Sequence, residues 1–232
     1  NPDSVALSWS VLSPASNGVA TVSGGVLSPS VFDYAPNEDF NGSDSFVVQV
    51  SDGHGGTDEI TVNVTVNPVN DGPAIGQTGP LSVTMDEDGT PLAFVAPTVE
   101  ATDVEGDTIT WSLAVGASNG TAEVSGDGAS PSTLTYVPGV DFNGSDSFTL
   151  EASDGDATSQ IEVQVTVTAR NDGPVLALNS GVTVDEGGAA TLDAGMLETT
   201  DVDDTAAELT YTVTTAPVNG LLALISSPDT AV

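Results

Sequence analysis

Acidic and amide side chains recur at matching places along the chain, and their chemistry stands out from the rest of the sequence. The block of eight residues at 39–46 is repeated without change at 141–148, and Asn-Asp-Gly-Pro occurs at both 70–73 and 171–174. Carboxylate and amide oxygens are ligands that calcium prefers in proteins. Acids that converge on one place repel one another unless a cation lies among them. These positions therefore predict cation binding, with a solvated acidic surface as the plainer alternative.

The charge balance of the chain points the same way. Thirty-four acidic residues stand against one cation, Arg170, which gives a formal net charge of −33. Nucleic acid is excluded as a partner because phosphate binding needs Lys and Arg, and anionic membrane surfaces are disfavoured. A compact fold with so many carboxylates should be assisted by counter-cations, for which divalent metal is the best candidate. Because cysteine is absent, metal ions rather than disulfides would be the cross-links.

Three other readings of polar and aromatic residues are weaker. His54 is replaced by Asp156 in the second copy of the repeat, which indicates a turn histidine rather than a catalytic base. Carboxylate pairs could serve glycoside hydrolysis, but acids that return in every copy indicate a structural role. Trp9 and Trp111 could stack on sugars, but each lies on a predicted strand whose residues alternate between apolar and polar, which favours packing in the core. We therefore expect no catalytic residues and no enzyme.

An internal repeat organises the whole chain. Asp39 and Asp141 are 102 residues apart, and the matches on either side keep nearly the same offset. A third copy begins after Pro174, where the sequence 184–186 answers 85–87. We predict the C-terminal part of one repeat at 1–71, a complete repeat at 72–172 and the N-terminal part of another at 173–232.

Short alternating segments predict the elements that position these acids. Residues 161–167 alternate apolar and polar side chains, as a half-buried strand requires. Ile109, Trp111 and Leu113 share one face of a further strand, matched by Leu7, Trp9 and Val11 and by Leu209, Tyr211 and Val213. We predict an all-β fold of tandem immunoglobulin-like or cadherin-like β-sandwiches, each with about seven antiparallel strands in a Greek key. No apolar run is long enough to span a membrane.

The motifs together resemble a known family. The string Tyr-x-Pro-x-x-Asp-Phe-Asn-Gly-Ser-Asp-Ser-Phe, followed by Ser-Asp-Gly and closed by Asn-Asp-Gly-Pro, resembles the cadherin-like tandem repeats of giant bacterial surface adhesins. The third copy, with its Val-Asp-Glu-Gly-Gly at 184–188 and Thr-Asp-Val-Asp at 200–203, is more similar to the chondroitin-sulfate-proteoglycan subtype of that superfamily.

This resemblance implies Ca²⁺ at the junctions between consecutive repeats. Gly72 and Gly173 stand where cadherin linkers carry Asn-Ala, which leaves the number of ions at each junction open. The implied ligands of the first junction are Asp39, Asp44, Asn70, Asp71, Asp103, Glu105 and Asp154. Those of the second junction are Glu87, Asp141, Asp146, Asn171, Asp172, Asp201 and Asp203.

The expected function is that of a calcium-rigidified spacer in a large extracellular adhesin at the cell surface, supporting cell adhesion. Its partners would be the neighbouring repeats of the same chain, with homophilic or filament contacts also open. No secretory signal is recognisable at the N-terminus, so an export signal would lie outside this sequence. Two alternatives remain: a sandwich module that binds a glycan or a protein, and a subunit of an extracellular filament.

Overall fold

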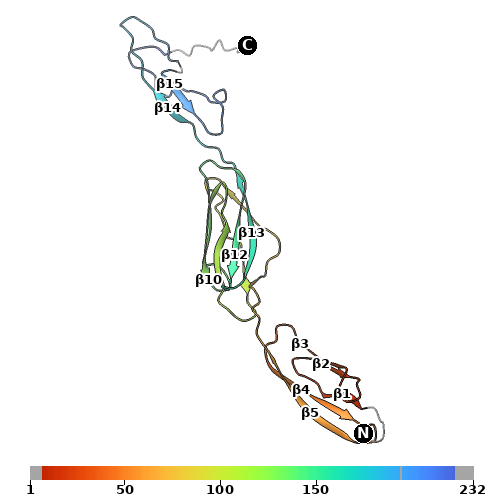
Figure 1. Cartoon of the computed structure of the whole chain (residues 1–232). Helices are drawn as coiled ribbons and strands as arrows, with labels where there is room; N and C mark the ends of the chain where they lie inside the picture. The colour runs from red at the N-terminus through yellow and green to blue at the C-terminus, as the bar shows by residue number, and fades with distance from the viewer. Residues whose placement is uncertain (1–6, 194, 223–232) are drawn as a thin grey trace.

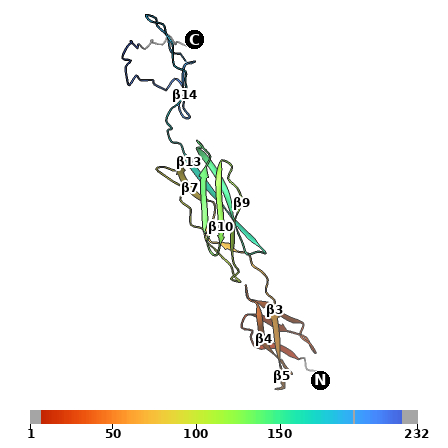
Figure 2. The same ribbon diagram turned by 90° about the vertical axis from the view of Figure 1, so that its left-hand side faces the viewer.

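The computed structural model describes residues 7–193 and 195–222, and these residues form fifteen β-strands and no helix. The strands fall into three bodies that follow one another along an elongated molecule (Figures 1 and 2). Strands β1 to β5 lie at one end, β6 to β13 form the middle body, and β14 and β15 lie at the other end. The predicted all-β architecture is confirmed. No helix capable of crossing a membrane occurs in the described part of the chain.

The middle body contains the most complete sandwich. Its large sheet has the order β11-β10-β9-β12-β13-β7, in which only the outer pair β13 and β7 is parallel. A small antiparallel sheet pairs β6 with β8. The strands are β6 (Ala74–Ile75), β7 (Leu81–Asp86), β8 (Ala101–Thr102), β9 (Thr110–Val115), β10 (Gly120–Asp127), β11 (Thr133–Pro138), β12 (Gly144–Ser153) and β13 (Thr158–Thr168).

Alternation in β12 and β13 builds the core of this sandwich. Every second residue is buried from Asp146 to Ala152 and from Ile161 to Val167, and Leu150 and Val163 are fully inaccessible. Trp111 is buried as predicted, and its indole N–H donates to the carbonyl of Gly128 at 2.9 Å. Tyr136 stacks on Phe148 with ring centroids 5.9 Å apart. Each large side chain buried in this way contributes about 1.5–3 kcal/mol.

The first body repeats part of this plan with a smaller core. Strands β1 (Ser8–Ser13), β4 (Gly42–Ser51) and β5 (Thr57–Val66) form one sheet, and β2 (Gly18–Ser23) pairs with β3 (Val31–Pro36). Phe46, Val48 and Val22 are its buried apolar residues, with Trp9 half-buried against them.

The third body differs from the sequence-based expectation. Its only strands among the described residues are β14 (Val175–Asn179) and β15 (Leu197–Thr200), which pair antiparallel. The predicted strand through Leu209, Tyr211 and Val213 does not form, and Tyr211 and Val213 are about half exposed. In the middle body the equivalent strand, β9, is held between β10 and β12. No described residue supplies those two neighbours in the third body, so the alternating segment has nothing to pair with.

Two linkers without strands separate the three bodies. The first lies between the end of β5 at Val66 and the start of β6 at Ala74. The second lies between the end of β13 at Thr168 and the start of β14 at Val175. Our division of the chain at 71/72 and 172/173 falls within these linkers and stays a prediction.

Candidate metal centre

At the first junction, acids of the second repeat hold the linker. The side-chain amide of Asn70 donates to Asp154 Oδ2 at 2.9 Å, and the backbone N–H of Asp71 donates to Glu105 Oε2 at 3.2 Å. The other Asp154 oxygen accepts the backbone N–H groups of Asp156 and Ala157. These bonds lower the pKa of Asp154 below its ordinary value, with the Ala157 bond as the largest cause. Asp154 is therefore an anchored anion that fixes where the linker leaves the first repeat.

Asp103 has a carboxylate oxygen without a partner at the same junction. Its Oδ1 accepts the backbone N–H of Asp107 at 3.0 Å, whereas its Oδ2 is buried and has no donor among the described residues. A buried carboxylate oxygen without a hydrogen bond is costly. This oxygen is available to a cation.

The second junction repeats the arrangement of the first. The backbone N–H of Asp172 donates to Asp203 Oδ2 at 2.6 Å, as that of Asp71 does to Glu105. Asp201 Oδ1 accepts the backbone N–H groups of Asp203 and Asp204, each at 2.9 Å. In the described part of the chain, Oδ2 of Asp201 and Oδ2 of Asp172 are both buried without a donor. Both junctions thus bury acid oxygens that no protein group satisfies.

The electrostatics around Asp172 mark where a cation would be most favourable. Burial raises the pKa of Asp172 above its ordinary value, and four neighbouring negative charges raise it further. Those charges belong to Asp88, Asp141, Asp203 and Glu87. All of these acids except Asp88 were predicted from the sequence. Asp88 does not recur, because the third copy has Gly187 at that place.

The carboxylate of Glu87 is held against the second linker by hydrogen bonds. One of its oxygens accepts the backbone N–H of Arg170, and the other accepts the side-chain amide of Asn143 at 3.4 Å. The guanidinium of Arg170 meanwhile pairs with Asp86, with Nη2 and Oδ2 at 2.7 Å. The sole cation of the sequence is therefore used inside the second repeat and does not neutralise the junction acids.

Asp44 and Asp146 are set apart from the junction acids by their hydrogen bonds. The carboxylate of Asp146 accepts the backbone N–H groups of Ser118, Asn119 and Ser147 and the hydroxyl of Tyr136 at 2.9 Å. Asp44 makes the same four bonds with the equivalent groups of the first repeat, including Tyr34. Because protein donors occupy these carboxylates, we do not include Asp44 and Asp146 in the proposed metal sites.

Asp39 and Asp141 share an uncommon backbone conformation. Their φ angles are 59° and 56°, in the left-handed region that Asp tolerates better than most residues. Both side chains are exposed, and the charge of Asp141 acts on Asp172. Asn70 and Asn171 each direct a side-chain amide to the carbonyl of the next residue, Asp71 and Asp172 respectively. The conformation of each loop is thus repeated along with its sequence.

The oxygen ligands present at each junction are of the types that calcium binds, but the acidic side chains are not gathered around one point. No three acidic or His side chains of the described residues are gathered closely enough to hold a metal by themselves. Calcium accepts carboxylate, amide and backbone carbonyl oxygens together, and all three kinds occur at each linker. The buried unpartnered oxygens of Asp103, Asp172 and Asp201 are what a cation would satisfy.

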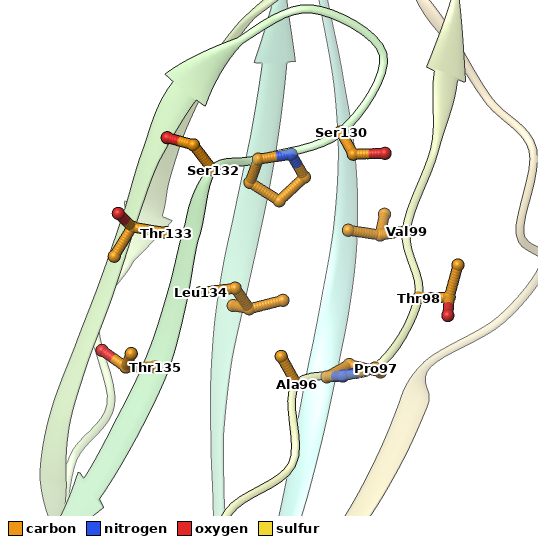
Figure 3. A pocket seen from close by; sticks show the side chains of 10 residues that line it. Ala96, Pro97, Thr98, Val99, Ser130, Ser132, Thr133, Leu134 and Thr135 are labelled. Atoms are coloured by element: carbon orange, nitrogen blue, oxygen red, sulfur yellow. The ribbon is translucent and has the colours of Figure 1, made fainter.

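A hollow elsewhere on the second repeat offers a different kind of surface. It has a volume of about 550 Å³ and lies between β11 and the extended segment 96–99 (Figure 3). Figure 3 shows the hydroxyl groups of Thr133 and Thr135 on one side and Val99 on the other. None of its lining residues is aromatic or charged. It therefore lacks the aromatic platform on which a sugar ring would stack.

Comparison with known families decides what the repeats are. Residues 1–65 and 70–168 match the family described as bacterial Ig domain. The chain belongs to the bacterial Ig domain family. In this bacterial Ig domain protein, residues 174–232 match the family described as cadherin-like, and the last ten of these lie outside the described residues. The sequence-based resemblance to cadherin-like repeats is thus confirmed.

Three known proteins are similar to parts of this chain. The bacterial Ig domain protein is 31% identical over 105 residues to extracellular matrix protein 3 of Lytechinus variegatus, which covers 45% of the chain and 3% of that protein. The crystal structure of human CDH23 EC21-23 matches with a TM-score of 0.50 at 18% identity, over 88% of this chain and 71% of the other. An endo-fucoidan hydrolase of glycoside hydrolase family 107 matches with a TM-score of 0.32 at 21% identity, over 72% of this chain and 24% of the other. The CDH23 likeness shows the fold alone, and the hydrolase likeness is too weak to bear on function.

Proposed function

We propose that this chain is a non-enzymatic spacer of an extracellular adhesion protein, stiffened by Ca²⁺ at the junctions between its repeats. The observation that carries the proposal is the set of buried carboxylate oxygens without donors, on Asp103 at the first junction and on Asp172 and Asp201 at the second. The extended arrangement of the three bodies supports a spacer (Figure 1). The relationship to an extracellular matrix protein supports an extracellular location.

Bound calcium would supply positive charge where the chain concentrates negative charge. Each linker already donates a backbone N–H to an acid of the next repeat, from Asp71 to Glu105 or from Asp172 to Asp203, and the first linker adds the side-chain bond from Asn70 to Asp154. These bonds bring acids of two consecutive repeats to one place, so a cation there would tie the repeats together. At the first junction the ion would be held by Asp39, Asn70, Asp71, Asp103 and Glu105, with Asp154 positioning the linker. At the second it would be held by Glu87, Asp88, Asp141, Asn171, Asp172, Asp201 and Asp203.

Rigidity follows from where those ligands lie in the chain. Without an ion, the next repeat is held only by the hydrogen bonds of Asn70 and Asp71 at the first linker and of Asp172 at the second. Mutual repulsion of the acids acts against these few bonds, so the repeats would swing relative to one another. With an ion, residues before, within and after the linker share one cation. The result is a stiff rod in which each module contacts mainly its neighbours. Such a rod would hold a distal adhesive region away from the cell, as in the surface adhesins whose repeats this sequence resembles.

Thermal unfolding with and without calcium tests the proposal. Calcium that binds only the folded chain raises the midpoint of unfolding by mass action. We expect the midpoint to be several degrees higher in millimolar Ca²⁺ than in chelator, and Mg²⁺ to have a much smaller effect because it demands stricter geometry. An equal midpoint in calcium and in chelator would show that the junction acids bind no calcium and form only a solvated acidic surface.

A role in glycan binding has less support. Trp111 and Tyr136 are buried in the core of the second repeat, and Trp9 is half-buried in the first. The hollow beside β11 contains no aromatic side chain. We therefore keep the spacer as the proposed function.

A further inference from the structure

The hollow beside β11 separates two backbone edges of the middle body. One is the outer edge of β11, a strand that ends its sheet and pairs with β10 alone. The other is the extended segment 93–99, whose backbone makes no hydrogen bond within the described part of the chain. The two edges face each other across the hollow (Figure 3). Each therefore presents unpaired N–H and C=O groups to the same space.

Contacts near both ends fix the segment 93–99 in its place across from β11. The ring of Phe94 packs on Tyr136 of β11 with centroids 6.0 Å apart. Beyond the other end, the backbone N–H of Ala101 donates to the carbonyl of Ala129 at 2.8 Å. Between these contacts lies Pro97, which has no N–H and therefore weakens direct pairing of the segment with β11. The hollow is thus bounded at both ends and open between them.

The side chains around the hollow are small or apolar. Ala96, Val99 and Leu134 point toward it in Figure 3. Val95 and Val137, in the two elements that flank it, are 70% and 63% exposed. The volume of about 550 Å³ is within the range of roughly 300–1,000 Å³ that is usual for ligand sites. Because unpaired backbone lies on two sides, this space fits an extended peptide better than a compact ligand.

The charges beside the hollow indicate which peptide fits. Glu100 directly follows Val99 at one end of the hollow. Glu123 lies opposite Thr135 in the pairing of β10 with β11, toward the other end. Both glutamates are exposed, and the sole cation of the sequence, Arg170, is paired elsewhere in the repeat. A second copy of this chain is disfavoured as the occupant, because each copy has a net charge of −33.

We propose that this hollow binds an extended peptide of another protein, with an uncharged centre and a basic residue at each end, as a strand inserted between β11 and segment 93–99. Main-chain hydrogen bonds to the two edges would give the contact its affinity, and alternate side chains of the peptide would contact the apolar lining. The two glutamates would attract the basic ends and make association sensitive to salt. This site goes beyond the spacer role, since it would let a repeat capture a partner along the side of the rod.

Fluorescence anisotropy with a defined peptide tests the proposal. The probe is fluorescein-labelled Lys-Val-Thr-Val-Thr-Val-Lys with blocked ends, titrated with the 232-residue chain. We expect saturable binding that A96F weakens several-fold, because the added ring would occupy the hollow. A93F is the matched control, since Ala93 is an exposed alanine of the same segment that does not line the hollow. Absence of saturable binding, or equal effects of A96F and A93F, would overturn the proposal.

A charge test uses the same assay with a second probe in which Gln replaces both Lys residues. The E100Q/E123Q variant should bind the Lys probe several-fold more weakly and the Gln probe as the wild type does. Equal effects on the two probes would contradict recognition of the basic ends.

Hydrogen exchange of backbone amides, followed by nuclear magnetic resonance, tests the inserted strand itself. In the free chain the amides of residues 93–96 should exchange fast, because they have no acceptor within the described residues. With the Lys probe bound, amides of this segment and of β11 should both exchange more slowly. Slow exchange at 93–96 in the free chain would show that the segment pairs with β11 directly, and protection of only one edge by the peptide would show that no strand is inserted. Either result would overturn the proposal.

Discussion

The guanidinium of Arg170 lies 2.7 Å from the carboxylate of Asp86, so the single cation of the sequence neutralises the most buried carboxylate of the described residues. Asp86 ends β7 and Arg170 lies just beyond the end of β13, so the ion pair joins the ends of two parallel strands. The hydrogen bond from Arg170 is the main reason that the pKa of Asp86 lies below its ordinary value. This cation stabilises a repeat, whereas both junctions are left with anions alone.

Removing Arg170 should destabilise the second repeat. In R170Q, Asp86 keeps only the backbone N–H of Leu92 as a partner, and a buried charge without its counter-ion is strongly unfavourable. Because the Arg170 side chain is 43% exposed, solvent screens part of the pair. A loss of about 1 kcal/mol would lower the midpoint of thermal unfolding of this repeat by roughly 4 to 8 °C. Scanning calorimetry in chelator measures the shift. The D86N/R170Q double variant removes both charges and should recover most of the loss; equal losses in the single and double variants would show that the pair does not stabilise the repeat.

The pair formed by Tyr136 and Asp146 should control stability in acid. Burial raises the pKa of Asp146, but the bonds from Asn119, Ser118, Tyr136 and Ser147 outweigh this effect and leave the pKa below its ordinary value. Because the pKa is lower in the folded state, this group stabilises the fold above its unfolded pKa of about 3.9. That stability is lost as the pH falls through the folded pKa.

Tyr136→Phe tests this link between hydrogen bonding and acid stability. The variant should lose about 1.5–3 kcal/mol, as expected for a hydrogen bond to a charged group, and should unfold at a higher pH. Near-ultraviolet circular dichroism followed from pH 6 to pH 2 measures the transition. Tyr34→Phe is the matched control, and its effect should be smaller because Tyr34 is only half-buried. An acid transition unchanged in Y136F would show that the hydroxyl does not hold Asp146 ionised.

Asp172→Asn should change the sign of its effect with calcium. In chelator the substitution removes a charge that is repelled by Asp88, Asp141, Asp203 and Glu87, so the variant should be at least as stable as the wild type. In millimolar calcium it removes a ligand, so the variant should be the less stable protein. Unfolding in urea under both conditions measures the two differences. The same order of stability with and without calcium would contradict a role for Asp172 in holding the ion.

Asp103→Asn should weaken calcium binding at the first junction alone. The buried Asp103 Oδ2 has no donor in the described part of the chain, whereas Asp107 contributes only its backbone N–H to this site. We expect isothermal titration calorimetry to show calcium affinity reduced about ten-fold or more at one class of sites, with the other class unchanged. Asp107→Asn is the matched control and should bind like the wild type. Equal effects of the two substitutions would indicate general charge attraction instead of ligation.

The strand pattern could be predicted from sequence wherever a strand has neighbours. The alternation at 161–167 and the aromatic Trp111 predicted β13 and the core correctly, because burial of one strand face leaves a period of two. The strand predicted from the same pattern at Leu209, Tyr211 and Val213 was wrong, because alternation specifies a strand only when partner strands are present. Local propensity does not report whether those partners exist.

The candidate site could be predicted only in part. Recurrence selects every acid that the repeat needs, so it selected Asp146, which caps backbone N–H groups inside the sandwich, together with Asp172, which faces the junction. Both roles demand an Asp at a fixed place, and only the direction of the side chain separates them. Asp88 was not predicted as a site residue for the opposite reason: its charge acts on Asp172 at the junction, but the residue does not recur in the third copy.

A distance measurement across the first junction tests the central claim most directly. The chain contains no cysteine, so spin labels at T61C on β5 and E123C on β10 would be the sole attachment points. Both residues are exposed and lie in different repeats. Pulsed electron spin resonance should give a broad distribution of label distances in chelator and a narrow one in millimolar calcium. Distributions of equal width under the two conditions would contradict a junction stiffened by calcium.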